Sequence, residues 1–522
     1  MEQPSSPIFL FLKKASGVGL WTILSRIGGF FREMMLAHFL GVGPVVDALV
    51  ISLKLPSFIR RITAEGAMNT VFVPLLSKIS AKEGCDTAER FASSVLGAAL
   101  IFVCTAAALF AIFSPYLICF LFPKLKATPD RLQMVISYSR IMFPFVIFIS
   151  ATAIYGGFLN TLGRFWAFAA SPFFGNLSII IFALLGIFYF NMGPNPLQIG
   201  LVFAWAVLFS GVVQLSVVVI DAIRSGSFFF PRFPKNSPRL QQFFLKLGPA
   251  ALSSGIAQVN LFVGLFIATF LPTGSISHLN YADRLVQMPL SVIGTALGVA
   301  LLPSLATHIS KKKTHLANAQ QEAALATAIL ASALVFTLTL ALSKVLVFLA
   351  YGRGRFTPTD VTETARALSA YVCGLPAYMI SKILATRFFA KGQMATPVRA
   401  GLYSLVADII FSVTLMGPLG HVGIAAASSI SAWVNTAVLA FALHKKGEWH
   451  FSPHLKKLFG GVCFLTFSLS TTLAFFMPTN YPANFLNGLG ILLFWVFGTG
   501  TIFLGAMRVF CWTSLKRCFP KL

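Results

Sequence analysis

Residues 54–80 read KLPSFIRRITAEGAMNTVFVPLLSKIS, and residues 287–310 echo them as QMPLSVIGTALGVALLPSLATHIS. Pro56 of the first copy aligns with Pro289 of the second, and a further pair of prolines aligns downstream. Each copy falls in the second helix of a predicted group of six. An even number of helices per group keeps the two copies in the same orientation, so the repeat predicts two parallel six-helix lobes around a central cavity.

Long apolar stretches extend this pattern over the whole chain. Of 522 residues, 57% are hydrophobic and 11% are charged, and the mean hydropathy is +0.82. Because a spanning helix needs roughly 20 apolar residues, we expect an all-α integral membrane protein with about 14 transmembrane helices. The predicted spans are 16–40, 45–76, 91–114, 133–158, 166–190, 197–222, 244–270, 279–306, 322–342, 361–389, 399–417, 421–444, 458–477 and 485–508.

These spans divide into three predicted parts. Helices 1–6 form an N-lobe at residues 1–222, helices 7–12 form a C-lobe at 244–444, and the last two helices form an appendage at 458–508. Glycine and proline predict bends in some of the longer helices, at Gly28-Gly29, Pro56 and Pro144.

The charge balance indicates topology. The formal net charge is +25, from 40 Lys and Arg against 15 Asp and Glu. Most of the basic residues lie in short loops on the side of the N-terminus, which predicts that both termini are cytoplasmic. No basic-aromatic module points to nucleic acid. The seven cysteines are scattered without a C-x-x-C pair, so we expect neither a disulfide framework nor a metal or cofactor site.

Four arginines lie inside the first two hydrophobic stretches, namely Arg26, Arg32, Arg60 and Arg61. Each costs roughly 2.5–3.5 kcal/mol at the centre of a lipid-facing helix, so four cost on the order of 10 kcal/mol. Facing a water-filled cavity removes that cost, and guanidinium groups in a cavity favour an anionic cargo, phosphate above all. The alternative for Arg26 and Arg32 is that they extend toward the membrane interface.

Other charged residues lie in the same helices or in the eighth. Asp47 either pairs with an arginine, gates the cavity or caps its helix. Arg61 and Glu65 have i,i+4 spacing and are candidates for a mutual salt bridge. In the eighth helix we expect Arg284 to face the cavity and Asp283 to face a neighbouring helix, because adjacent residues point about 100° apart.

Later helices offer further candidates in Lys382, Arg387 and Asp408. Asp408 follows an apolar run and either binds a cation or pairs with a structural partner. The sequence contains neither a G-x-x-x-x-G-K-[ST] phosphate loop nor an H-E-x-x-H motif, and its loops are too short for a catalytic domain. We therefore expect a protein that is not an enzyme.

Several motifs together resemble the MurJ/MviN family of lipid II flippases. The matching stretches are SRIGGFFRE (25–33), VDAL (46–49), KLPSFIRRITAEGAMNTVFVP (54–74), LNTLGRF (159–165), YADRLVQMPLSVIGTALGVALLPSL (281–305), YGRGRFTPTD (351–360), GLPAY (374–378) and ATPVRAG (395–401). They cover most of the first twelve helices, whereas the last two helices match mainly in number and hydrophobicity.

The resemblance implies a member of the MOP exporter superfamily that works by alternating access in the bacterial cytoplasmic membrane. Its cargo would be lipid II, the undecaprenyl-diphosphate-linked precursor of peptidoglycan. By motif, the cavity arginines of the family correspond to Arg26, Arg32, Arg60 and Arg284, and the last two helices to a groove for the lipid tail. The family's acidic positions correspond to Asp47 and Glu65.

The resemblance has one gap. Some members bind sodium through an acidic residue of the seventh helix, where this chain has Gln258 and Asn260 but no carboxylate. Asp408 is then a remnant or a partial cation site, and the membrane potential is the alternative energy source.

Rival functions remain open at this point. They are a flippase for another polyprenyl-diphosphate glycan, a multidrug exporter of the same superfamily, a cell-wall scaffold without transport, and an integral enzyme acting on lipid phosphates. The cationic cargo of a drug exporter opposes the arginines. The predicted partners are lipid II, membrane lipids and possible cell-wall synthesis proteins, with the chain acting as a monomer.

Overall fold

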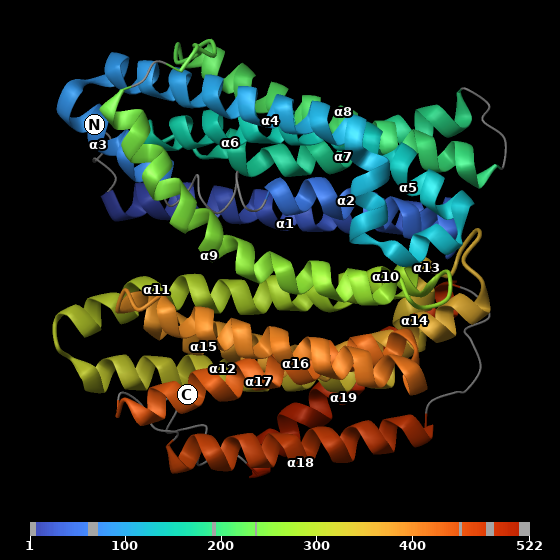
Figure 1. Ribbon diagram of the computed structural model, residues 1–522. Helices are drawn as coiled ribbons and strands as arrows, with labels where there is room; N and C mark the ends of the chain where they lie inside the picture. The colour runs from blue at the N-terminus through green and yellow to red at the C-terminus, as the bar shows by residue number, and fades with distance from the viewer. Residues whose placement is uncertain are drawn as a thin grey trace. The chain divides into compact units, whose positions relative to one another are not determined.

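The computed structural model describes residues 7–60, 71–189, 195–234, 237–447, 452–476 and 485–510. Within these ranges the chain is helical and contains no β-strand (Figure 1). It forms two compact units, Met1–Gly274 and Ser275–Leu522.

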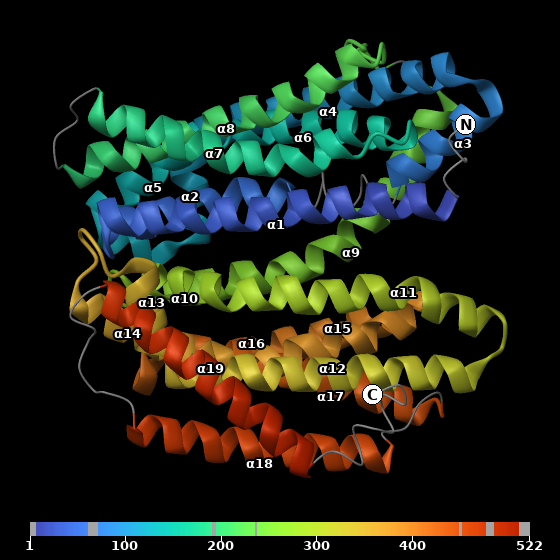
Figure 2. The same ribbon diagram turned by 180° about the vertical axis from the view of Figure 1, so that it is seen from behind.

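The first unit is a bundle of long helices (Figure 1). Helix α7 packs on α8 and α1, α6 packs on α8 and α4, and α2 packs on α5. Figure 2 shows α1 lying along α7 on the opposite face of the same unit. The elements are α1 (Pro7–Leu40), α2 (Pro44–Arg60), α3 (Val73–Glu83), α4 (Cys85–Leu121), the 3-10 helix η2 (Pro123–Ala127), α5 (Pro129–Met142), α6 (Phe145–Thr161), α7 (Trp166–Phe188), α8 (Pro196–Arg224) and α9 (Pro238–Ala268).

An aromatic core closes one end of this bundle. Phe72, Phe91 and Phe243 are buried and lie with ring centroids 6.2–6.3 Å apart. Beside them, Tyr155 stacks on Phe229, which belongs to the segment between α8 and α9. These rings tie α3, α4, α6 and the start of α9 together, because aromatic pairs add to the stability that burial provides.

The second unit has its own core. Helix α16 packs along α17, α10 packs on α14, and α15 contacts α11, α12 and α17. The last two helices join this unit, α18 through α12 and α19 through α13. The elements are α10 (Ser275–Pro289), the π-helical η3 (Leu290–Gly294), α11 (Thr295–Ser310), α12 (Thr314–Ala341), α13 (Ser343–Tyr351), α14 (Pro358–Val372), α15 (Leu375–Ala390), α16 (Ala395–Leu419), α17 (His421–Lys445), α18 (Pro453–Phe476) and α19 (Phe485–Phe510).

Each predicted span is mostly helical where the structure describes it, which confirms the all-α membrane fold. Among the described residues, eight helical segments are long and apolar enough to cross a bilayer. These eight do not include α1, α2 or α10, the helices that carry the candidate arginines. A chain with this many apolar helices is a multi-pass membrane protein.

Breaks in the longer helices occur at proline or glycine. The break at Pro144 lies where the sequence predicted a bend, and the others do not. Pro144 separates α5 from α6. The predicted span 361–389 is instead interrupted at Cys373 and Gly374, where Gly374 lies against the backbone of Ser429 without room for a side chain. The predicted span 279–306 passes through a π-helical turn directly after Pro289.

Helix α1, by contrast, continues without interruption through Gly28 and Gly29. A side-chain carbon at either position would meet Asn176 of α7 at 3.5 Å. Because 3.5 Å is an ordinary van der Waals distance, a small side chain would fit at either position. Helix α9 contacts α2 and α4 and so belongs to the first unit, whereas the repeat assigns its sequence to the second lobe.

Candidate functional site

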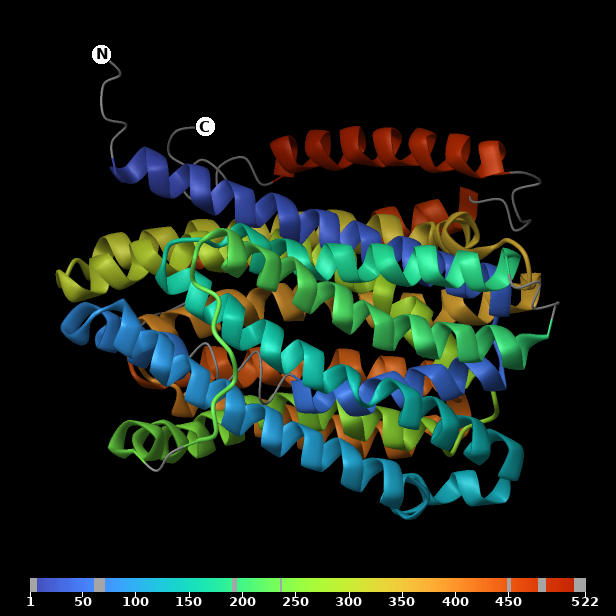
Figure 3. The ribbon, with the colours of Figure 1, turned by 90° about the horizontal axis from the view of Figure 1, so that it is seen from above.

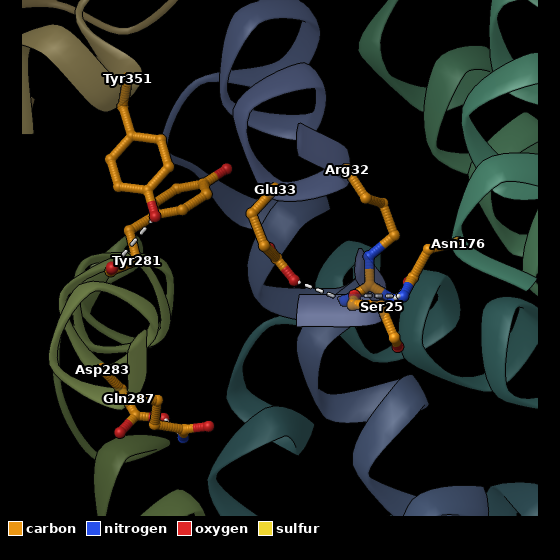
Figure 4. A network of polar contacts seen from close by, with 8 residues as sticks. All are labelled: Ser25, Arg32, Glu33, Asn176, Tyr281, Asp283, Gln287 and Tyr351. Carbon is orange, nitrogen blue, oxygen red and sulfur yellow. Dashed lines mark hydrogen bonds and ion pairs between the residues drawn. The ribbon is translucent and has the colours of Figure 1, made fainter. Parts of the chain in front are cut away.

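Arg32 is the candidate arginine with the best-defined surroundings (Figure 4). Its Nη1 donates to Oδ1 of Asn176 at 3.1 Å, and its Nη2 donates to Oε1 of Glu33 at 2.7 Å. Asn176 in turn donates from Nδ2 to the backbone oxygen of Ser25 at 3.1 Å. The amide of α7 thus connects two successive turns of α1, and it directs the guanidinium of Arg32 toward α7.

The Arg32 network is only partly neutralised and only partly buried. The Arg32 side chain is 17% exposed, and that of Glu33 is 4% exposed. A guanidinium has more N–H donors than these two contacts use, so Arg32 retains donors for an anion. Glu33 orients the charge without removing the capacity to bind.

The other candidate arginines lie on less enclosed parts of their units. Arg26 is exposed on α1, and Arg60 is partly buried as the last residue of α2. Arg284 is partly buried on α10 of the second unit. Arg60 and Arg284 each have a polar or ring contact within the structure. Arg61 and Glu65 lie outside the described residues.

Asp47 forms a buried ion pair with Arg131 at one end of the first unit. Its side chain is fully buried, and its Oδ2 accepts from Nη2 of Arg131 at 2.8 Å. The same oxygen accepts from the backbone N–H of Gly274 at 2.7 Å. Asp47 lies in the first turn of α2, and its own N–H bonds to Gly43, so it is not the helix cap. It joins α2, α5 and the segment that follows α9.

In the second unit, Asp283 accepts a hydrogen bond from Nε2 of Gln287 one turn along the same helix (Figure 4). This contact lies within α10, and the contact of Asp283 with a neighbouring helix stays a prediction. Nearby, Tyr351 donates from its hydroxyl to the backbone oxygen of Tyr281 at 3.3 Å.

The remaining candidates have separate environments. Arg387 is buried, and its Nη1 donates to Oδ1 of Asn318 and Oε1 of Gln321, both at 2.8 Å, which ties α15 to α12. Asp408 is buried on α16 beside Ser428 of α17, and its Oδ1 has no hydrogen-bond partner among the described residues. Lys382 is exposed. The side chains of Gln258 and Asn260 are not among those described.

Two polar centres of the first unit were not predicted from the sequence. Arg131 of α5 pairs with Asp47 across 84 residues. Asp221 is buried at the end of α8, where it accepts from Arg164 and from the indole N–H of Trp166 at 3.2 Å. The hydrogen bond that Arg164 donates to Asp221 raises the pKa of Arg164 above its ordinary value. Asp47 and Asp221 both lie in predicted apolar spans, where a carboxylate needs a partner, and this was the signal that the sequence offered.

In the described part of the chain, no group of three or more His, Cys, Asp and Glu side chains is placed to hold an ion.

Solved structures share the overall architecture. An inward-facing multidrug-resistance MATE transporter of the MOP superfamily superimposes with a TM-score of 0.63 at 14% identity, over 87% of this chain and 96% of that one. A structure titled lipid II flippase MurJ in an inward closed conformation superimposes with a TM-score of 0.76 at 24% identity, over 93% of this chain and 98% of that one. The chain therefore shares the fold of these two solved transporters.

Sequence comparison narrows the class further. The family model described as lipid II flippase MurJ matches residues 36–493. A probable lipid II flippase MurJ from Rickettsia prowazekii (strain Madrid E) is 34% identical over 83% of this chain and 84% of its own length. One from Rhizobium tropici is 33% identical over 84% of this chain and 83% of its own length. The chain belongs to the MurJ family.

Proposed function

We propose that this chain transports lipid II from the inner to the outer leaflet of the cytoplasmic membrane by alternating access. The observation that carries the proposal is the match to the lipid II flippase family over residues 36–493, which contain two of the four candidate arginines, Arg60 and Arg284. Arg26 and Arg32 precede the matched range on α1. The fold and the placement of Arg32 support the same function.

In the proposed mechanism, Arg26, Arg32, Arg60 and Arg284 bind the diphosphate of the headgroup. Guanidinium groups suit this task because they present paired N–H donors to phosphate oxygens and stay charged at every physiological pH. Arg32 is already oriented by Asn176 and Glu33, so it loses little conformational freedom on binding.

Lobe motion would carry the headgroup across the membrane. We propose two lobes built from helices 1–6 and 7–12, as the repeat predicts, with α18 and α19 as the appendage that accommodates the lipid tail. Asp47, Arg131 and the backbone of Gly274 are placed to hold one end of the first unit closed. The lobe boundary near residues 222–244 is part of the proposal.

The energy source in this mechanism is the membrane potential. An inside-negative potential favours outward movement of an anion by roughly 2.3 kcal/mol per charge per 100 mV. The arginines must then reset without carrying the same positive charge outward. We propose that the chain acts as a monomer with both termini in the cytoplasm, and that any cell-wall enzymes that use lipid II act as separate partners.

Native mass spectrometry of the full-length chain tests the choice of cargo. Lipid II, a different polyprenyl-diphosphate glycan and a cationic drug are added at equal concentrations. The proposal predicts that lipid II is retained most strongly, and that Arg26→Ala weakens its retention. Arg366→Ala is the matched control, because Arg366 is 65% exposed and pairs only with Glu363 among the described residues. Preferential retention of the drug would contradict the proposal.

A further inference from the structure

The segment at residues 225–234, with the sequence SGSFFFPRFP, presents two opposite faces. It connects α8 to α9 and has no helical structure beyond its first turn. Phe229 is 3% exposed, whereas Phe230 is 73% and Phe233 is 83% exposed. One face of the segment is therefore packed into the bundle, and the other presents large aromatic rings outward.

The inner face is fixed to two helices. The hydroxyl of Tyr155 donates to the backbone oxygen of Phe229, whose ring packs between Tyr155 and Phe158 of α6. Farther along, the backbone N–H of Arg232 donates to the backbone oxygen of Ser93 on α4 at 3.1 Å. Figure 3 shows this segment crossing the helices of the first unit as an extended strip of chain.

A close approach to α4 sets where the segment crosses. A side-chain carbon at Gly97 would lie 1.9 Å from the backbone oxygen of Arg232, so only glycine fits there. The segment therefore contacts α4 over the turn that runs from Ser93 to Gly97.

This turn lies where α4 changes from polar to apolar. The last charged residue of α4 is Arg90, and residues 91–122 contain no charge. Helix α4 has 37 residues, which corresponds to a length of about 55 Å, against a hydrocarbon core of about 30 Å. One end of α4 must extend past the core, and the change in polarity places Ser93 at the level of the lipid headgroups.

Positive charge accompanies the exposed rings. Arg232 lies between Phe230 and Phe233, and Arg224 ends α8 just before the segment begins. Both arginines are exposed, and neither guanidinium has an ion pair among the described residues. Arg239, by contrast, is paired with Glu83. Aromatic rings next to unpaired basic groups are the combination that interfacial anchors use.

We propose that the 225–234 segment is a membrane anchor that binds anionic phospholipid of the cytoplasmic leaflet. Arg232 contacts the phosphate, while Phe230 and Phe233 insert among the acyl chains just below it. A lipid is favoured over a protein partner because the segment lies on a spanning helix where Ile101, one turn after Gly97, is 47% exposed and also faces outward. The assignment to the cytoplasmic leaflet rests on the proposed orientation of the chain, with both termini in the cytoplasm.

Quenching of an introduced tryptophan tests contact with lipid directly. The full-length Phe233→Trp variant is reconstituted into vesicles that contain either brominated phosphatidylglycerol or brominated phosphatidylcholine at the same mole fraction. The signal of the chain without this substitution is subtracted. We expect quenching by both lipids, and stronger quenching by phosphatidylglycerol.

Adding Arg232→Gln should lower the preference for phosphatidylglycerol about fivefold, the weight of one basic residue at an anionic surface. Lys311→Gln removes the same charge from an exposed position outside the segment, and it should leave the preference unchanged. Arg232 is exposed, so the variant is expected to fold.

Two results would overturn the proposal. An introduced tryptophan that neither lipid quenches would show that a protein or solvent covers the segment. A lipid preference that Arg232→Gln and Lys311→Gln leave equally intact would show that Arg232 does not select anionic lipid. Lipid II retention, measured separately, reports on the proposed transport function and does not depend on this outcome.

Discussion

Loss of Arg131 should destabilise the first unit strongly. Asp47 is fully buried, and the Arg131 side chain is 7% exposed. In Arg131→Met, the Asp47 carboxylate keeps the N–H of Gly274 but loses its cation. Removing one partner of a buried ion pair costs about 3–5 kcal/mol, because the other charge stays buried without compensation. This cost lowers the folding equilibrium constant more than about 100-fold.

The exposed pair of Arg366 with Glu363 provides a matched control. Its side chains are 65% and 36% exposed, and such surface pairs contribute about 0–1 kcal/mol. The free energy of unfolding is measured for Arg131→Met and Arg366→Met by titration with sodium dodecyl sulfate in mixed micelles. Adding Asp47→Asn to Arg131→Met should recover part of the loss, because it removes the isolated charge.

Equal losses of 1 kcal/mol or less in Arg131→Met and Arg366→Met would refute the reasoning. The buried pair of Asp47 with Arg131 would then contribute no more to stability than an exposed ion pair.

Two other substitutions test close packing and buried charge in the same unit. Gly97→Ala should lower the free energy of unfolding by about 1–3 kcal/mol, because the added carbon displaces the backbone of Arg232. Faster hydrogen exchange at Phe229 and Arg232 would confirm this cause, and unchanged exchange would contradict it. Asp221→Asn weakens the hydrogen bonds from Arg164 and Trp166 to a buried carboxylate. It should therefore lower the free energy of unfolding by about 1–3 kcal/mol. An unchanged unfolding midpoint in the detergent titration would show that these hydrogen bonds do not stabilise the unit.

The sequence predicted helix positions well because long apolar runs have few alternatives in a bilayer. Pro144 also predicted the break between α5 and α6. The break at Gly374 escaped prediction because its cause is the approach of Ser429, 55 positions away in the chain and invisible to local patterns. Helix α1 continues through Gly28 and Gly29, and the bend predicted there stays a prediction.

The candidate site was predictable by residue type but not by partner. An arginine inside an apolar helix is expensive, so Arg32 stood out from the sequence alone. Its contact with Asn176 spans 144 positions, and the pairing of Asp47 with Arg131 spans 84. No periodicity links residues so far apart, so these contacts required the folded chain.

The central claim is that arginines on α1, α2 and α10 bind the headgroup that is transported. Its most direct test is the rate of lipid II translocation in reconstituted vesicles, for Arg26→Ala, Arg60→Ala and Arg284→Ala beside the control Arg366→Ala. The account predicts that each of the three abolishes translocation while the folded protein stays in the membrane, and that the control translocates normally. Normal translocation by all three arginine variants would contradict it.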